Sequence, residues 1–159
     1  MKATTIALGS LLALSACSQS QRPTGERNEA ASLPTTFHFS QLGLRVLTST
    51  INRQQGTTAT LYGNDLARQA ALTSTGAAQP GEVLALVTWQ QQPDPNWFGA
   101  RIPGALQSVE VLRTKPGPEG HPTVTYQFFA GKDLTLRTDT LHQQKRIAFL
   151  LAQKPAVLP

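Results

Sequence analysis

The chain is poor in cysteine, in charge and in aromatic residues, and each shortage excludes a class of protein. A single cysteine among 159 residues cannot form an internal disulfide, so a disulfide-stabilised scaffold is excluded. Charged residues are only 14%, too few for a long coiled coil, and the 12 glycines and 11 prolines follow no collagen-like repeat. The 40% of hydrophobic residues in a chain of this length favours one globular domain.

The excess of basic residues does not indicate a nucleic-acid surface. There are 14 Lys and Arg against 9 Asp and Glu, which gives a net charge of +5. The basic residues are scattered singly, and aromatic residues are only 6% of the chain. Proteins that bind nucleic-acid backbones gather cations on one face and add aromatic stacking platforms. We therefore expect no nucleic-acid partner.

The first residues have the features of a signal peptide. Lys2 provides a positive start, residues 3–14 form an apolar run too short to cross a bilayer, and small residues precede Cys17. The string Leu-Ser-Ala-Cys at 14–17 resembles the lipobox of bacterial lipoproteins, in which the cysteine is acylated and begins the mature chain. The alternative is an ordinary secretory signal that contains a cysteine.

The resemblance to a lipobox predicts a protein of the bacterial cell envelope, held on the periplasmic face of a membrane by lipid on Cys17. Ser18 at the next position favours the outer over the inner membrane. We expect residues 1–16 to be the signal peptide, 17–34 the lipidated cysteine and a flexible polar tether, and 35–159 a single domain.

Hydrophobic periodicity predicts an α+β, mainly β domain, an antiparallel sheet of about five strands with a short helix after the first hairpin and a C-terminal helix. The continuous apolar run at 83–89 predicts the central strand, covered on both faces. The other expected elements, in chain order, are strands at 42–51 and 57–62, a helix capped by Asn64 or Asp65 and ending at Gly76, a long loop at 90–104, strands at 106–113 and 123–129, a short strand at 134–136, and a helix at 141–153 capped by Thr138 or Thr140.

The expected loop at 90–104 contains Trp97 and Phe98, and two bulky aromatic side chains favour packing against the domain or around a pocket. With Trp89 they are our candidate pocket aromatics, and burial in the core is the alternative reading. The isolated charges of Arg101 and Glu110 are expected to be solvated.

Several strings together look like the cytochrome P-460 family. They are TLYGNDLA at 60–67, Trp89 at the end of a Pro-Gly-led strand, DPNW at 94–97, IPG at 102–104 and GKDL at 131–134. The resemblance implies a periplasmic, mainly antiparallel β protein that is usually a dimer. It also implies c-type haem on a C-x-x-C-H motif near the C-terminus, a lysine cross-linked to the porphyrin, and oxidation of hydroxylamine.

The sequence departs from this family at the residues that carry its chemistry. Residues 138–142 read TDTLH where C-x-x-C-H is expected, and Leu86, Thr88 or Gln90 stands where the lysine would be. Without the two thiols no covalent haem forms. We therefore expect no resident cofactor and no hydroxylamine oxidation, and no other catalytic motif is present.

Two functions from different classes remain. The first is a membrane-anchored module that binds a small ligand or has a structural role, with its ligand unknown. The second is a redox or gas-binding protein in which His142, at the position of the family's axial ligand, holds noncovalent haem; the alternative for His142 is a histidine in the first turn of a helix. His38 and His121 have no metal-binding spacing, so we expect no metal site.

Overall fold

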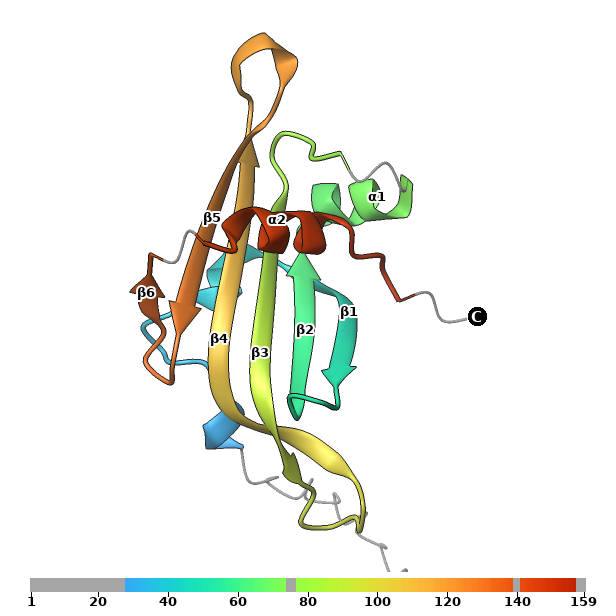
Figure 1. Cartoon of the computed structure of the whole chain (residues 1–159), viewed down its shortest axis with the longest axis vertical. Coiled ribbons are helices and arrows are strands. Elements are labelled where there is room, and N and C mark those ends of the chain that lie inside the picture. Colours follow the sequence, from blue (N-terminus) through green and yellow to red (C-terminus); the bar gives the residue numbers. More distant parts are fainter. Residues whose placement is uncertain (1–27, 74–76, 139–140, 157–159) are drawn as a thin grey trace, which may run out of the picture.

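The structure is a computed structural model that describes residues 28–73, 77–138 and 141–156. Its centre is one antiparallel sheet whose six strands are ordered as they occur in the chain (Figure 1). The strands are β1 (Arg45–Asn52), β2 (Thr57–Gly63), β3 (Val83–Pro93), β4 (Arg101–Lys115), β5 (Thr123–Ala130) and β6 (Thr135–Arg137). The helices are α1 (Asp65–Thr73) and α2 (Gln143–Leu151), and the 3-10 turns are η1 (Glu29–Ala31), η2 (Phe39–Leu42) and η3 (Pro118–Gly120). The predicted mainly β class is confirmed, with six strands instead of about five.

Helices α1 and α2 cover one face of the sheet. Alternate residues of β2, β3 and β4 point to this face and meet Leu150 of α2 and Ala67 of α1. The buried cluster consists of Leu47, Leu61, Ala67, Leu84, Leu86, Leu112 and Leu150. In Figure 1, α2 crosses the central strands at a steep angle, with its C-terminal end toward β2. We call this the helix face.

The opposite face is covered by the segment that precedes β1. Ala31, Leu33, Phe37 and Phe39 pack on a second buried cluster that includes Val87 and Trp89. The Trp89 indole Nε1 donates to the Ala31 carbonyl at 2.8 Å, and the Asn28 amide donates to the Pro103 carbonyl at 2.7 Å. Residues 28–34, which we expected to be the end of the tether, thus contribute contacts to the sheet. Trp89 is 9% exposed and belongs to the buried core of this face.

The β2–α1 connection forms as the sequence predicts. The Asn64 side-chain oxygen accepts from the Ala67 amide at 2.9 Å, which caps α1. The same oxygen accepts from the Val83 amide at 3.2 Å, and the Asn64 amide group donates to the Gly81 carbonyl at 2.8 Å. One side chain therefore joins the start of α1 to the start of β3. The predicted end of this helix at Gly76 lies outside the described residues.

The predicted loop at 90–104 is wrong, because most of it continues the β3–β4 hairpin. Gln91 pairs with Pro103, Gln92 with Ile102, and Pro93 with Arg101, so only residues 94–100 form the turn. Gln90 and Gln91 also donate side-chain hydrogen bonds to Gly56 and Thr58 of the neighbouring hairpin. These cross-strand amide contacts support an extended backbone where the composition suggested a coil.

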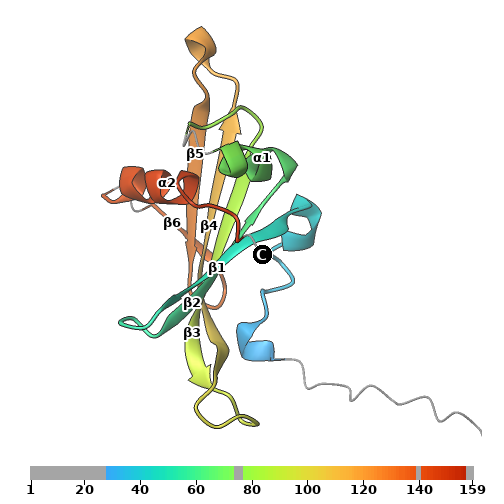
Figure 2. The same cartoon turned by 90° about the vertical axis from the view of Figure 1, so that its right-hand side faces the viewer.

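The expectation that Trp97 and Phe98 pack on the domain is also wrong. The hairpin runs past the rest of the sheet, so no other element of the described chain faces its tip (Figures 1 and 2). Trp97 is 72% exposed and Phe98 is fully exposed.

Helix α2 begins later than predicted and without the predicted cap. The capping position is His142, whose side chain makes no capping hydrogen bond, and Thr138 is not adjacent to the helix. Thr140, the other predicted cap, and Cys17 with the whole predicted signal peptide lie outside the described residues. In the part of the chain that the structure describes, no helix is long and apolar enough to cross a membrane.

Candidate functional site

The N-terminal half of α2 and strands β4 and β5 enclose a pocket of about 190 Å³ that opens to solvent. Its walls are Glu110 from β4, two aromatic side chains from β5, and three residues at the start of α2. The lining residues are Glu110, Tyr126, Phe128, His142, Gln143 and Arg146. We call this the α2 pocket. Because it lies where a helix crosses a rigid sheet, its walls are held by backbone that packs elsewhere in the core.

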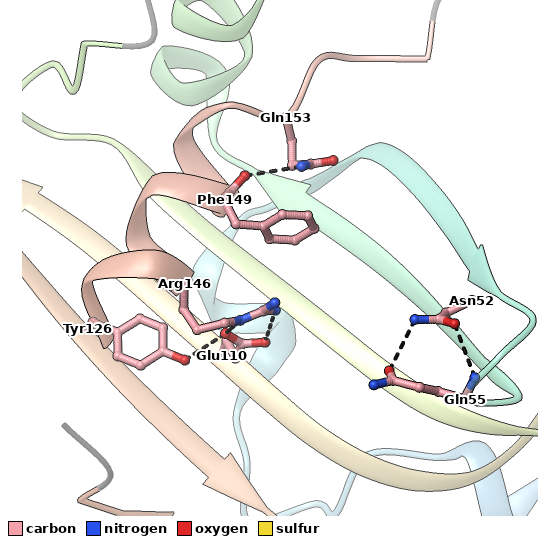
Figure 3. A network of polar contacts seen from close by, with 7 residues as sticks. All are labelled: Asn52, Gln55, Glu110, Tyr126, Arg146, Phe149 and Gln153. Carbon is pink, nitrogen blue, oxygen red and sulfur yellow. Dashed lines mark hydrogen bonds and ion pairs between the residues drawn. The ribbon is translucent and has the colours of Figure 1, made fainter. Parts of the chain in front are cut away.

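A bidentate ion pair forms the floor of the α2 pocket. Arg146 Nη2 lies 2.6 Å from Glu110 Oε1, and Arg146 Nε lies 2.8 Å from Glu110 Oε2 (Figure 3). The Glu110 side chain is 5% exposed and that of Arg146 is 38% exposed. Paired hydrogen bonds of this kind fix the plane of the guanidinium as well as its position. Arg146 also lies over the ring of Phe149, 4.6 Å from its centroid.

Tyr126 completes the network. Its hydroxyl donates to Glu110 Oε2 at 2.6 Å, so that this oxygen accepts from both Tyr126 and Arg146. Burial raises the pKa of the Tyr126 hydroxyl well above its usual range, and the hydrogen bond to Glu110 raises that pKa further. The hydrogen bond to Glu110 raises the pKa of Arg146. Tyr126 is therefore a neutral donor and Arg146 a cation at physiological pH.

The sheet register and the helix period bring these residues together. Glu110 is the direct partner of Phe128 on β5 and of Leu86 on β3, so all three share the helix face. His142, at the capping position of α2, is spaced four residues from Arg146, and Arg146 four from Leu150, so the three form one stripe. Leu150 is buried in the core cluster, which turns Arg146 and His142 toward the sheet. The Arg146 amide donates to the His142 carbonyl at 3.0 Å.

The prediction that Glu110 is a solvated charge is wrong. Its position in β4 puts it on the same face as Leu112, and Arg146, the partner that permits its burial, is 36 residues further along the chain. Period-two alternation around Val109 and Val111 would have placed Glu110 on an inner face, but it could not identify the partner. Arg146 was missed because it belongs to a run of polar residues that favours a solvated helix surface.

The other predicted site residues are spread over the molecule. His142 does line the α2 pocket, at its exposed rim. Trp89 lies in the core of the opposite face, and Trp97 and Phe98 are at the hairpin tip, so none of the three lines the α2 pocket. His38 precedes η2 and His121 follows η3. Within the described ranges, no group of three His, Cys, Asp or Glu side chains is arranged to bind a metal.

A haem does not fit the α2 pocket. The volume of about 190 Å³ is below the range of roughly 300–1,000 Å³ in which drug-sized molecules bind, and a porphyrin needs more space than most of these. The bonded pair of Arg146 and Glu110 lines the same pocket as His142, so it takes up part of the wall that a macrocycle would need. The sequence has no cysteine near this site that could form a thioether. The pocket has the size and walls for a smaller molecule.

Comparison with known proteins adds no relative to this description: no family model matches the chain, and no curated protein matches it.

Proposed function

We propose that this protein is a lipid-anchored module of the bacterial cell envelope that binds a small ligand in the α2 pocket. The lipobox-like sequence before Cys17 supports the anchor, and the size and walls of the pocket support the ligand. The observation that carries the proposal is a guanidinium fixed by a buried carboxylate at the floor of an open pocket. The resemblance to the cytochrome P-460 family remains a prediction, in which this chain is a member without covalent haem.

The chemistry of the pocket walls indicates the class of ligand. Tyr126 and Phe128 offer aromatic surface, whereas Gln143 and His142 add polar atoms at the rim. Arg146 uses Nε and Nη2 for Glu110, so Nη1 lies outside that pair. Planar molecules with an apolar body and a carboxylate can stack on the aromatic walls and accept from this nitrogen. We therefore propose a small aromatic or unsaturated carboxylate as the ligand class.

Titration with benzoate, followed by amide chemical shifts of the mature chain in detergent, tests the pocket. We expect shifts at Phe128, Gln143 and Arg146, and smaller ones with neutral benzamide. Replacing Glu110→Gln and Arg146→Met together removes the guanidinium without leaving a buried carboxylate unpaired, and benzoate affinity should fall about tenfold or more. Arg113→Met is the matched control, because Arg113 bonds Gln127 on the opposite face.

Equal benzoate affinity in the double variant and the parent would contradict the proposed ligand class. Haem titration is a separate arm of the same experiment. A Soret band that disappears in His142→Ala would favour the noncovalent haem reading and would require the α2 pocket to rearrange.

The mass of the mature chain from a bacterial host tests the anchor. We expect cleavage before Cys17 and the added mass of acyl chains, both lost in Cys17→Ser. An unmodified chain that is cleaved elsewhere would show that the ordinary secretory signal is correct.

A further inference from the structure

The hairpin tip, residues 94–100, exposes more aromatic surface than any other turn of the described chain. Trp97 and Phe98 are adjacent, and no element among the described residues covers either of them. A pair of large apolar side chains held in water is costly unless it meets an apolar surface, because burying apolar area is the main source of binding free energy. Scattered leucines and isoleucines on a surface carry no such meaning.

The tip has a defined shape. The Asp94 amide donates to the Ala100 carbonyl at 3.0 Å, and the Ala100 amide donates to the Trp97 carbonyl at 3.1 Å. Asp94 Oδ1 accepts from the Asn96 amide at 2.8 Å, and Gly99 adopts a φ of 79°, which favours glycine. These bonds hold the turn in one shape, with the two exposed aromatic residues at its tip. A preorganised apolar tip loses little conformational entropy when it inserts into a partner.

Asn28, the first described residue, lies at the same end of the molecule. Asn28 is bonded to Pro103, close to the base of the tip, and η1 contacts β4. In Figures 1 and 2, η1 and the β3–β4 turn lie at the same end of the sheet, away from α1. Pro103 is 5 residues after Phe98, a span of about 17 Å in extended chain.

Asn28 is 11 residues after Cys17, so a fully extended connection reaches at most about 40 Å. The lipid on Cys17 therefore keeps the base of the tip within that distance of the bilayer. The span of about 17 Å from Pro103 to Phe98 is less than half of this reach, so the tip can meet the bilayer while the tether is extended. Tryptophan favours the boundary between headgroups and acyl chains, where its ring is buried and its N–H stays hydrated. Arg101, which begins β4 and is exposed, suits anionic headgroups at that depth.

We infer that the hairpin tip inserts Trp97 and Phe98 into the lipid–water interface of the membrane that holds Cys17. The inference rests on the lipid anchor of the proposed function. The lipid and the tip are two points of attachment, which together fix the tilt of the domain and turn α1 and η3 away from the bilayer.

Fluorescence of the full-length lipidated protein in vesicles tests this arrangement. The chain has 2 tryptophans, and Trp89 is buried and bonded to Ala31, so it serves as an internal reference. The protein is reconstituted into vesicles of phosphatidylethanolamine and phosphatidylglycerol, with and without bromine on the acyl chains. We expect brominated lipid to remove about half of the emission, the part from Trp97, because bromine quenches only on contact. Trp97→Phe should show no quenching.

A matched variant places the reporter at the other end of the molecule. Leu72 near the end of α1 is 59% exposed, and Leu72→Trp combined with Trp97→Phe keeps two tryptophans. This variant should be quenched no more than Trp97→Phe alone. Quenching as strong as in the parent chain would show that the domain lies flat, which overturns the inference.

The remaining outcomes distinguish failure of the tip insertion from failure of the lipid anchor. Protein that floats with the vesicles but shows no quenching of Trp97 retains the anchor and overturns the inference. Protection of Trp97 from aqueous iodide without quenching by brominated lipid means that another protein covers the tip, which also overturns it. Protein that does not float refutes the anchor, and the inference falls with it.

Discussion

At the scale of single residues, the structure buries two carboxylates that have different hydrogen-bond partners. Glu110 is paired with a guanidinium and a phenol, so its charge is balanced within the helix face. Glu82 is 2% exposed, and its Oε1 accepts from the Gln79 amide at 2.6 Å. Its backbone amide donates to the Thr114 hydroxyl. One carboxylate serves a pocket, and the other closes a turn at the start of β3.

The burial of Glu82 predicts a pH-dependent stability. Burial raises the pKa of this carboxyl above its ordinary value of 4.5, and the Gln79 hydrogen bond opposes the rise more weakly. A raised pKa in the folded state means that Glu82 favours folding most below 4.5, and that this contribution is lost as pH rises through the folded pKa. Glu82→Gln keeps an acceptor for Gln79 and cannot ionise. We expect its melting temperature to equal that of the parent at acidic pH and to exceed it at neutral pH.

Thermal unfolding of both chains across this pH range measures the effect. Glu29→Gln is the control, because Glu29 is exposed and the same substitution there changes no buried group. A difference between Glu82→Gln and the parent that stays constant with pH would refute the explanation.

At the scale of elements, the sequence predicts correctly those helices and strands whose ends are determined by neighbouring residues. Alternation and turn residues predict the β1–β2 hairpin, Asn64 predicts the start of α1, and the apolar run predicts β3, which is indeed central. The extension of β3 and β4 was missed because its support comes from side-chain amides that reach a neighbouring hairpin. The ion pair of the α2 pocket was missed for the same reason: Glu110 and Arg146 are separated by 36 residues, and no local pattern relates them.

The Asn64 junction predicts graded losses of stability. Asn64→Ala removes the cap of α1 and the bonds to Gly81 and Val83, and we expect it to lower the free energy of unfolding by about 2 kcal/mol. Asn64→Asp keeps the two acceptor bonds and loses the donor to Gly81, so its cost should be about 1 kcal/mol. Urea unfolding measures both. Equal losses in the two variants would mean that the acceptor bonds of Asn64 contribute nothing.

At the scale of the whole molecule, the sheet is covered on both faces by segments from opposite ends of the chain. The helix face depends on α2, near the C-terminus, and the other face on residues 28–44, near the N-terminus. The predicted boundary between tether and domain at residue 34 passes through this second cover. The polar composition of residues 18–34 favoured a tether, but Ala31 and Leu33 make apolar contacts with the sheet. Asn28 also bonds to β4, and Ala31 bonds to β3.

The second cover predicts that shortening the chain weakens the fold. A chain that begins at Thr35 lacks the contacts of Ala31 and Leu33 and the hydrogen bond to Trp89, and we expect it to unfold about 2–3 kcal/mol more easily than one that begins at Asn28. Urea unfolding in a Trp97→Phe background gives the measurement, because Trp89 is then the only reporter. Its emission should also shift to longer wavelength in the shorter chain. Identical curves would show that residues 28–34 do not stabilise the sheet.

Because every strand pairs with its neighbour in sequence, the sheet contains no crossover, and its longest connection is the excursion through α1 between β2 and β3. Apart from that connection, such a meander can grow one hairpin at a time, and each hairpin closes a short loop at a small cost in chain entropy. The slow contacts are the two distant ones, α2 on β4 and residues 28–33 on β3 and β4. Refolding should therefore form the sheet first and complete the α2 pocket only when the last helix docks.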